Sequence, residues 1–240
     1  MSLPPLSTFE AAIVDLDGTL VDTLGDFEVA LNLSLKDLGL PPVTRALVAH
    51  TVGKGSEHLI RAVLAHQLAL PEASGQVVGG ERPTVDTLYA PAWQRYQHHY
   101  RQINGAHSAV YPGVEEGLRA LRDAGLALAC LTNKPLAFAR DLLQVKGLAH
   151  HFQQVFGGDS FERKKPDPLP LHKTCEALGM AACDTLMVGD SSNDAEAGHA
   201  AGCGVVLVTY GYNHGEPIRD TPALAWVDAL SDIPAALATR

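Results

Sequence analysis

Short apolar runs alternate with amphipathic segments along most of the chain. Four runs are rich in β-branched or aliphatic residues, and each leads toward a polar or glycine-containing stretch: Ala11–Val14, Leu126–Leu131, Leu186–Val188 and Val205–Val208. A fifth, weaker run covers Gln154–Phe156. Because the runs are short and almost continuously apolar, they are typical of strands that are covered on both faces.

Apolar residues recur at helical spacing between these predicted strands. The pattern predicts helices over Val114–Ala124, Leu136–Lys146, Leu169–Leu178 and Asp194–Ala201. A glycine follows each of them, at Gly125, Gly147, Gly179 and Gly202, where a left-handed C-cap suits glycine. Strands that alternate with helices of about ten residues predict an α/β fold with a Rossmann-like parallel sheet and helices on both faces.

The pattern changes between about Leu24 and Ile103. Strand patterns stop, and apolar residues follow helical spacing, as in the series Phe27, Leu31, Leu35, Leu38 and the series Leu59, Ile60, Val63, Leu64. We therefore expect an all-helical cap domain over residues 23–103, inserted after the first strand of a core domain formed by residues 1–22 and 104–240. Trp93, Tyr96 and Tyr100 form an aromatic stripe that favours helix packing over a ligand box, and the glycine-rich stretch 73–83 is typical of a mobile linker.

Charge and composition narrow the classes of partner. The chain has 18 basic and 27 acidic residues, a formal charge of −9, which argues against nucleic acid or an anionic membrane surface. No apolar run approaches the roughly 18 residues of a membrane-spanning helix, and the first residues lack the basic and apolar segments of a signal peptide. We expect a cytoplasmic protein, and the sequence does not distinguish a monomer from a homodimer.

The cysteines and histidines do not predict a zinc site. The four cysteines lack C-x-x-C spacing, and we expect them to be reduced and partly buried. No Cys/His set has the spacing of zinc ligands. The adjacent pairs His98-His99 and His150-His151 are expected to point in different directions, and most of the eleven histidines to lie at the surface.

Acidic residues gather at the ends of two predicted strands. Asp15 and Asp17 follow the first strand, and Asp190 and Asp194 follow the third. Ligands of open parallel sheets bind outside the carboxyl ends of the strands, where these loops converge. No Lys or Arg precedes Lys36, so no local cation neutralises the first pair. Clustered carboxylates favour a bound metal, and all-oxygen, acid-rich ligation suits Mg²⁺ over zinc.

Other strand ends supply groups suited to phosphate. Thr132 offers a hydroxyl after the second strand, and Lys165 offers a compact positive charge in the segment Arg163–Pro168. Gly18 allows a sharp turn beside the ligand. The pattern D-x-D-G-T at Asp15–Thr19 would arise by chance about once in a thousand chains of this length. The set predicts a site for a phosphate, a divalent cation and a carboxylate nucleophile, which serves phosphoryl transfer.

Four segments together resemble the haloacid dehalogenase-like hydrolase superfamily over essentially the whole chain: "DLDGTLVDT", "LTNK", "KKPDP" and "VGDSSNDAEAGHAAGC". The chain further resembles the phosphoglycolate phosphatases in the stretches 111–135 and 188–218. In that family the insert after the first motif is a helical cap that closes over a small phosphorylated metabolite. The resemblance implies a Mg²⁺-dependent phosphomonoester hydrolase.

The resemblance also assigns roles to individual residues. It implies that Asp15 attacks phosphorus and forms an aspartyl phosphate, while Asp17 protonates the leaving oxygen and then activates water. Thr132 and Lys165 would hold the phosphoryl group, with Asn133 nearby. The metal would be held by Asp15, the backbone carbonyl of Asp17 and Asp190, with Asp194 completing or supporting the shell. In the cap, Gly53, Lys54 and Gly55, with Arg61 as a further candidate, could bind a substrate carboxylate.

Related activities remain as alternatives. Dehalogenases need no acid at Asp17, and phosphonatases resemble D-x-A-G-T, so Asp17 argues against both. Phosphatases of other small metabolites and sugar phosphomutases share Asp17 and a small cap, and kinetics would be needed to separate them. A non-catalytic phospho-aspartate switch of the receiver type is a different class, but receivers are about half this length and lack the helical insert.

Overall fold

A parallel sheet organises the core domain in the computed structural model, which describes residues 4–71 and 82–238. The strand order is β5-β4-β1-β6-β7-β8. Its strands are β1 (Ala11–Val14), β4 (Ala127–Leu131), β5 (Gln154–Phe156), β6 (Thr185–Gly189), β7 (Gly204–Val208) and β8 (Ala225–Val227). All neighbouring strands pair in parallel, so the predicted Rossmann-like core is confirmed.

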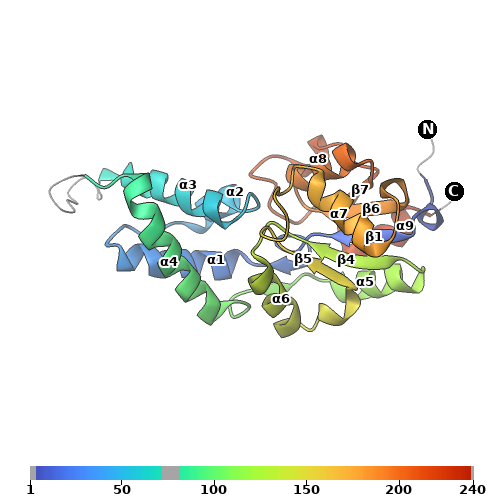
Figure 1. The fold of residues 1–240 in the computed structure, drawn as a ribbon, viewed down its shortest axis with the longest axis horizontal. Coiled ribbons are helices and arrows are strands. Elements are labelled where there is room, and N and C mark those ends of the chain that lie inside the picture. Colours follow the sequence, from blue (N-terminus) through green and yellow to red (C-terminus); the bar gives the residue numbers. More distant parts are fainter. Residues whose placement is uncertain (1–3, 72–81, 239–240) are drawn as a thin grey trace.

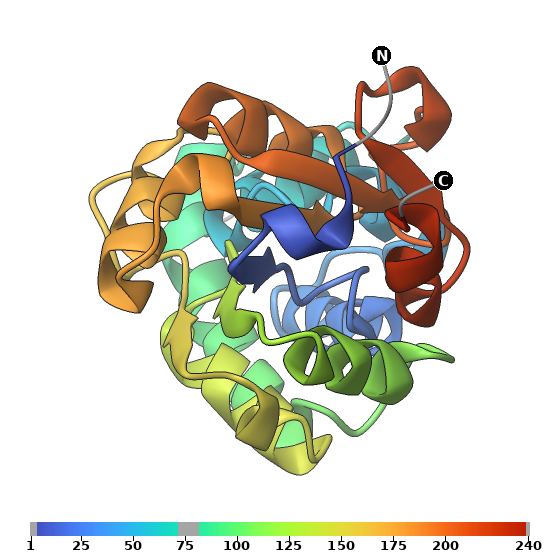
Figure 2. The ribbon, with the colours of Figure 1, turned by 90° about the vertical axis from the view of Figure 1, so that its right-hand side faces the viewer.

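Helices cover both faces of this sheet (Figure 2). They are α5 (Val114–Asp123), α6 (Leu136–Val145), α7 (Leu169–Leu178), α8 (Ser192–Ala201) and the short α9 (Ile233–Ala236). Val14 of β1 packs in a cluster with residues of α5 and α6, whereas its neighbour Ile13 packs in a cluster with residues of α7 and α8. Alternate residues of one strand thus face opposite layers, which explains the continuous apolar runs.

The boundaries of these elements agree closely with the predicted ones. The four glycines that follow α5, α6, α7 and α8 all have positive φ, as expected for C-caps. Helix α8 begins two residues earlier than predicted, because Ser191 precedes it and exchanges hydrogen bonds with Asp194 in the first turn. Strand β8 and the antiparallel ribbon of β2 (Val21–Asp22) and β3 (Ala109–Val110) were not predicted, since such short elements carry little periodic signal; β5, also of three residues, was predicted only as a weaker run.

The cap consists of helices that lie side by side at one end of the molecule (Figure 1). In the described residues they are α1 (Leu24–Asp37), α2 (Arg45–Thr51), α3 (Ser56–Leu68) and α4 (Val85–Ile103). Tyr96 and Tyr100 of the predicted aromatic stripe are buried, and Tyr100 stacks on Phe27 of α1. The stripe therefore packs helices together. The predicted linker at 73–83 lies mainly outside the described residues.

The sheet register sets the position of the predicted site. Val14, the last residue of β1, lies opposite Cys130 of β4 and Val188 of β6. The three strands therefore end at nearly the same level, and their following loops meet at one edge of the sheet, next to the cap. Across residues 4–71 and 82–238, none of the helices combines the length and apolar character that a bilayer span requires.

Candidate active site

A pocket lies between the loops of the core and the cap helices. Its core wall includes Asp15, Asp17, Thr132, Asn133, Lys134, Lys165, Asp190 and Asp194. Its cap wall includes Phe27, Val52, Gly53, Gly55, Ser56 and Leu59. The structure thus brings together the acidic, hydroxyl and basic groups that the strand ends predicted, from segments far apart in the sequence.

Lys165 connects two of the acids at the centre of the pocket. Its ammonium donates hydrogen bonds to Asp15 Oδ1 (2.7 Å), Asp194 Oδ1 (2.7 Å) and the Leu131 carbonyl (2.8 Å). An ammonium has three N–H donors, so all are in use. Burial lowers the pKa of Lys165, but the two carboxylates outweigh it and raise that pKa above its ordinary value. The side chain is therefore a fixed positive charge.

Asp15 is a buried carboxylate whose pKa is raised by its surroundings. Burial raises its pKa to about 7, with Lys165 lowering the pKa and Asp194 raising it again. Asp15 Oδ1 is occupied by Lys165, and no described residue hydrogen-bonds to Oδ2. One oxygen of the predicted nucleophile thus remains available to an electrophile or a cation.

Asp190 is held by two donors from different loops. Its Oδ1 accepts from Thr19 Oγ1 (2.9 Å), and its Oδ2 accepts from the Tyr212 backbone N–H (2.6 Å). Burial raises the pKa of Asp190 well above its ordinary value, and Asp194 and Asp15 add to this. Gly18 has a φ of +90°, and a Cβ there would lie 2.2 Å from Asp190 Oδ2, so this turn requires glycine.

These acids form a cluster that is able to bind a metal. Ligand atoms of Asp15, Asp190 and Asp194 lie within 4.8 Å of one another, and all three residues are buried. Lys165 is the one cation in contact with them in the described structure, so three carboxylates face a single positive charge. A divalent cation would remove the excess negative charge and needs oxygen ligands of this kind.

Asp194 differs from the other two in the number of donors that it serves. Its Oδ2 accepts from Ser191 Oγ (2.7 Å) and, at longer range, from the backbone N–H groups of Ser191 (3.2 Å) and Asp190 (3.3 Å). Its Oδ1 accepts from Lys165. Asp194 therefore fixes the loop after β6 in addition to any contact with a metal.

Asp17 forms an ion pair with Lys134, a lysine for which the sequence predicted no role. Lys134 Nζ donates to Asp17 Oδ1 at 2.7 Å, and the side chains of Lys134 and Asp17 are 2% and 9% exposed. The same ammonium lies 4.4 Å from the centre of the Phe27 ring and 4.9 Å from that of Tyr100. The cap thus places two aromatic faces against a core lysine, in cation–π contact.

Thr132 and Asn133 occupy the loop after β4, as expected. Thr132 is buried at the pocket wall, and its hydroxyl accepts from the backbone N–H of Lys134 (3.2 Å). Asn133 Oδ1 accepts from the backbone N–H of Lys165 (3.1 Å), and its Nδ2 donates to the Lys165 carbonyl (2.8 Å) and the Gly53 carbonyl (3.0 Å). Asn133 therefore positions the Lys165 segment and the cap loop.

The predicted cap residues divide into two groups. Gly53 and Gly55 line the pocket, and the Gly53 carbonyl also accepts from Asn193 Nδ2 (3.4 Å). Lys54 is exposed and does not line the pocket. Arg61 pairs with Glu57 and Asp86 on the cap surface, away from the pocket wall. A role for Lys54 in binding substrate stays a prediction.

The site uses several residues that sequence reasoning did not assign: Thr19, Lys134, Ser191, Asn193 and Tyr212. Thr19, Lys134, Ser191 and Asn193 lie inside the quoted motifs, which was the available signal. Tyr212 lies beyond the four motifs but within the stretch 188–218, and its hydroxyl donates to Asp22 Oδ1 (2.6 Å) and accepts from the backbone N–H of Thr23 (2.8 Å). Tyr212 joins the loop near Asp190 to the segment that leads into the cap.

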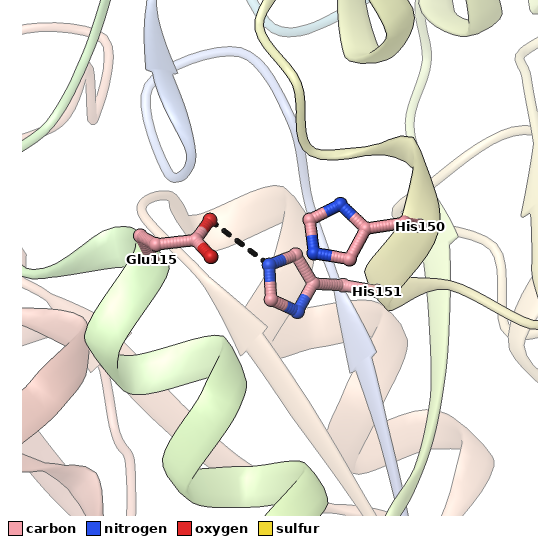
Figure 3. Close-up of side chains that lie close together, drawn as sticks. All are labelled: Glu115, His150 and His151. Carbon is pink, nitrogen blue, oxygen red and sulfur yellow. Dashed lines mark hydrogen bonds and ion pairs between the residues drawn. The ribbon is translucent and has the colours of Figure 1, made fainter.

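A second cluster, of Glu115, His150 and His151, lies far from the pocket in the core domain (Figure 3). The expectation that adjacent histidines diverge is wrong here, because His150 and His151 lie in a 3₁₀ turn (Ala149–His151) with ring centres 4.0 Å apart. His151 Nε2 pairs with Glu115 Oε2 (2.9 Å), which lowers the pKa of Glu115. Arg122 Nη1 lies 3.4 Å from His151 Nδ1.

The guanidinium of Arg122 argues against a metal at this cluster. A guanidinium can only donate, so His151 Nδ1 accepts from Arg122 and the proton of the neutral ring lies on Nε2, facing Glu115. A metal at Nε2 would have to displace that proton beside a permanent positive charge. We interpret the cluster as a hydrogen-bonded link that joins α5 to the turn before β5.

Comparisons with known proteins agree with this geometry. A family model described as haloacid dehalogenase-like hydrolase matches residues 12–208. The chain is 38% identical to a phosphoglycolate phosphatase of Thiobacillus denitrificans over 93% of both chains, and 42% identical to a plasmid phosphoglycolate phosphatase of Cupriavidus necator over 95% of this chain and 92% of the relative.

A crystal structure of a predicted phosphoglycolate phosphatase from Haemophilus somnus superposes with a TM-score of 0.86. It shares 34% identity and covers 94% of this chain and 96% of its own. The resemblance noted in the four motifs is thereby confirmed over most of the sequence. The chain belongs to the haloacid dehalogenase-like hydrolase family.

Proposed function

We propose that this protein is a Mg²⁺-dependent phosphoric monoester hydrolase that acts on a small phosphorylated metabolite in the cytoplasm, with 2-phosphoglycolate as its substrate. The observation that carries the proposal is the buried group of Asp15, Lys165, Asp190 and Asp194, which combines a carboxylate, a fixed ammonium and a surplus of negative charge. Relatives named phosphoglycolate phosphatases match over nine-tenths of the chain, and they are the reason for choosing 2-phosphoglycolate as the substrate.

Asp15 supplies the nucleophile in this proposal. Its Oδ2 attacks phosphorus and displaces the alcohol oxygen, which forms an aspartyl phosphate, while Lys165 holds Oδ1 and orients the carboxylate. Lys165 also neutralises charge on the phosphoryl oxygens, and Thr132 provides a hydroxyl at the same wall of the pocket. Asp15, Asp190 and the Asp17 carbonyl, with support from Asp194, would hold Mg²⁺, which would supply further positive charge at the phosphoryl group.

Asp17 completes the reaction as acid and then as base. It lies two residues after Asp15 at the pocket wall. In its protonated form it would give its proton to the departing oxygen, and the carboxylate that remains, paired with Lys134, would later take a proton from the water that hydrolyses the aspartyl phosphate. The cap closes the pocket with Phe27, Val52 and Leu59, which limits access of water to the aspartyl phosphate.

The test is a phosphate-release screen over a panel of phosphometabolites with Mg²⁺, using Asp15→Asn as the blank. We expect the highest kcat/KM with 2-phosphoglycolate, and turnover that needs no sugar bisphosphate. Activity that appears only with a sugar bisphosphate, and yields an isomer in place of phosphate, would identify a phosphomutase. A stable aspartyl phosphate without turnover would instead indicate a phospho-switch.

A further inference from the structure

Lys134 is a buried cation that the mechanism above does not use. It lies in the loop after β4, and its side chain is 2% exposed at the boundary between core and cap. Removing an ammonium from water is costly unless an anion compensates. In the described structure its one hydrogen-bond acceptor is Asp17, and the faces of Phe27 and Tyr100 cover other sides of it.

Two lysines line the pocket among the described residues, and only one has spare donors. Lys165 uses its three N–H groups on Asp15, Asp194 and the Leu131 carbonyl. Lys134 uses one on Asp17, and in the described structure its other two N–H groups have no oxygen or nitrogen acceptor, only the neighbouring faces of Phe27 and Tyr100. Lys134 is therefore the cation at the pocket wall that can receive an additional anionic group.

The position of Lys134 relative to Asp17 limits what that group can be. Asp17 protonates the leaving oxygen, so this oxygen lies next to the Asp17 carboxyl during the reaction. Lys134 Nζ is 2.7 Å from Asp17 Oδ1. A carboxylate whose carbon is two bonds from the leaving oxygen therefore lies within reach of Lys134, whereas the phosphoryl group lies on the side of Asp15 and Lys165.

The geometry points to Lys134 as the specificity-determining residue that binds the carboxylate of a 2-phosphoglycolate-like substrate. This inference rests on the proposed function and names the group that recognises the non-phosphoryl end of the substrate. The contact with Asp17 shows that this ammonium donates to a carboxylate oxygen at 2.7 Å, and the aromatic walls keep water away from the pair. The exposed Lys54 does not line the pocket.

The test compares two substrates that differ only in charge. The full chain, Lys134→Met, Lys54→Met in the predicted cap loop and the control Lys36→Met, at an exposed cap lysine, are assayed with 2-phosphoglycolate and with its neutral amide analogue. Both substrates lose turnover in Lys134→Met because Asp17 loses its partner, so the ratio of the two kcat/KM values is the readout. We expect Lys134→Met to lower this ratio about 100-fold, Lys134→Arg to restore most of it, and Lys36→Met to leave it nearly unchanged.

An equal loss for both substrates in Lys134→Met would overturn the inference, as would a ratio that falls only in Lys54→Met. If Lys134→Met is inactive on both, calorimetry in the Asp15→Asn background decides. In that background, the added Lys134→Met change is expected to weaken the binding of 2-phosphoglycolate about 100-fold and that of inorganic phosphate only slightly. Equal weakening of the two would overturn the inference. Failure of the proposed function is distinct, because the unmodified chain would then show no preference for 2-phosphoglycolate.

Discussion

Asn133 and Gly53 join the core to the cap through a hydrogen bond of 3.0 Å from the side-chain amide to the backbone carbonyl. The same asparagine exchanges two hydrogen bonds with the backbone of Lys165, one as acceptor and one as donor. One side chain therefore connects closure of the cap to the position of the lysine that orients Asp15. Asn193 adds a longer bond of 3.4 Å to the same carbonyl.

Replacing Asn133 should impair the enzyme because its side chain positions both Lys165 and the cap loop at Gly53. We expect Asn133→Ala to lower kcat/KM about 100-fold, with KM raised by loss of the cap contact and kcat lowered by displacement of Lys165. Asn193→Ala is the graded comparison, and about a tenfold loss is expected because its bond to Gly53 is longer. Steady-state kinetics with 2-phosphoglycolate measures both. Equal losses in the two variants would contradict a special role for Asn133.

The substitutions Asp190→Asn and Asp194→Asn should differ in their effects on Mg²⁺ affinity and on stability. Asp190 accepts two hydrogen bonds, whereas Asp194 accepts from Lys165 and three donors of its own loop. We expect Asp190→Asn to weaken Mg²⁺ binding at least 100-fold with little loss of stability. Asp194→Asn should lower the free energy of unfolding by about 2 kcal/mol and weaken Mg²⁺ binding by a smaller factor than Asp190→Asn does.

Calorimetric titration with Mg²⁺ and urea unfolding of both variants measure the two effects. A larger loss of metal affinity in Asp194→Asn than in Asp190→Asn would mean that Asp194 is the stronger ligand. The loop contacts of Asp194 would then be secondary to its role at the metal.

How much of the fold and the site could be predicted depended on which features leave a pattern in nearby residues of the sequence. The runs around Val14, Leu131 and Val188 predicted their strands because burial on both faces leaves a continuous apolar record in the chain. The sequence placed Asp15 and Asp190 together because the carboxyl ends of parallel strands share one edge. Both inferences need only the order and length of elements.

Lys134 shows what such signals omit. A lysine after Thr132 and Asn133 reads as a solvated loop residue, and its burial arises from Phe27 of α1 and Tyr100 of α4, which approach only when the cap packs on the core. Lys54 shows the reverse case, since flanking glycines favoured a binding loop but the side chain is exposed. The direction of a side chain between two domains leaves no periodic pattern in the sequence.

Asp26 should be the main polar anchor of the hinge between cap and core. It is fully buried in α1 and accepts from the backbone N–H groups of Gly105 (2.8 Å) and His107 (2.7 Å) in the returning segment. Asp26→Ala leaves both N–H groups without this partner, and we expect the free energy of unfolding to fall by about 3–5 kcal/mol. Asp26→Asn keeps an acceptor oxygen and should lose about half of that.

Urea unfolding of the metal-free protein measures this change. Asp37→Ala is the matched control, because Asp37 ends the same helix and its carboxylate is exposed in an ion pair with His99. No measurable loss is expected for Asp37→Ala. If Asp26→Ala were as stable as this control, the two backbone bonds would contribute nothing to the hinge.

Binding of Mg²⁺ should depend on pH in the neutral range because of Asp15. Burial raises the pKa of this acid from 3.8 to about 7, so in the metal-free protein it holds a proton below about pH 7 and is ionised above it. A cation at the carboxylate must displace that proton. The dissociation constant for Mg²⁺ should therefore rise toward tenfold per unit through Asp15 as the pH falls below about 7, and Asp190, whose pKa burial also raises, adds to this rise. Titration calorimetry in buffers of different ionisation enthalpy measures both the affinity and the proton released, and Asp15→Asn should release none through this group. An affinity for Mg²⁺ that is unchanged from about pH 5.5 to pH 8 would show that Asp15 is already ionised throughout, with Lys165 outweighing the effect of burial.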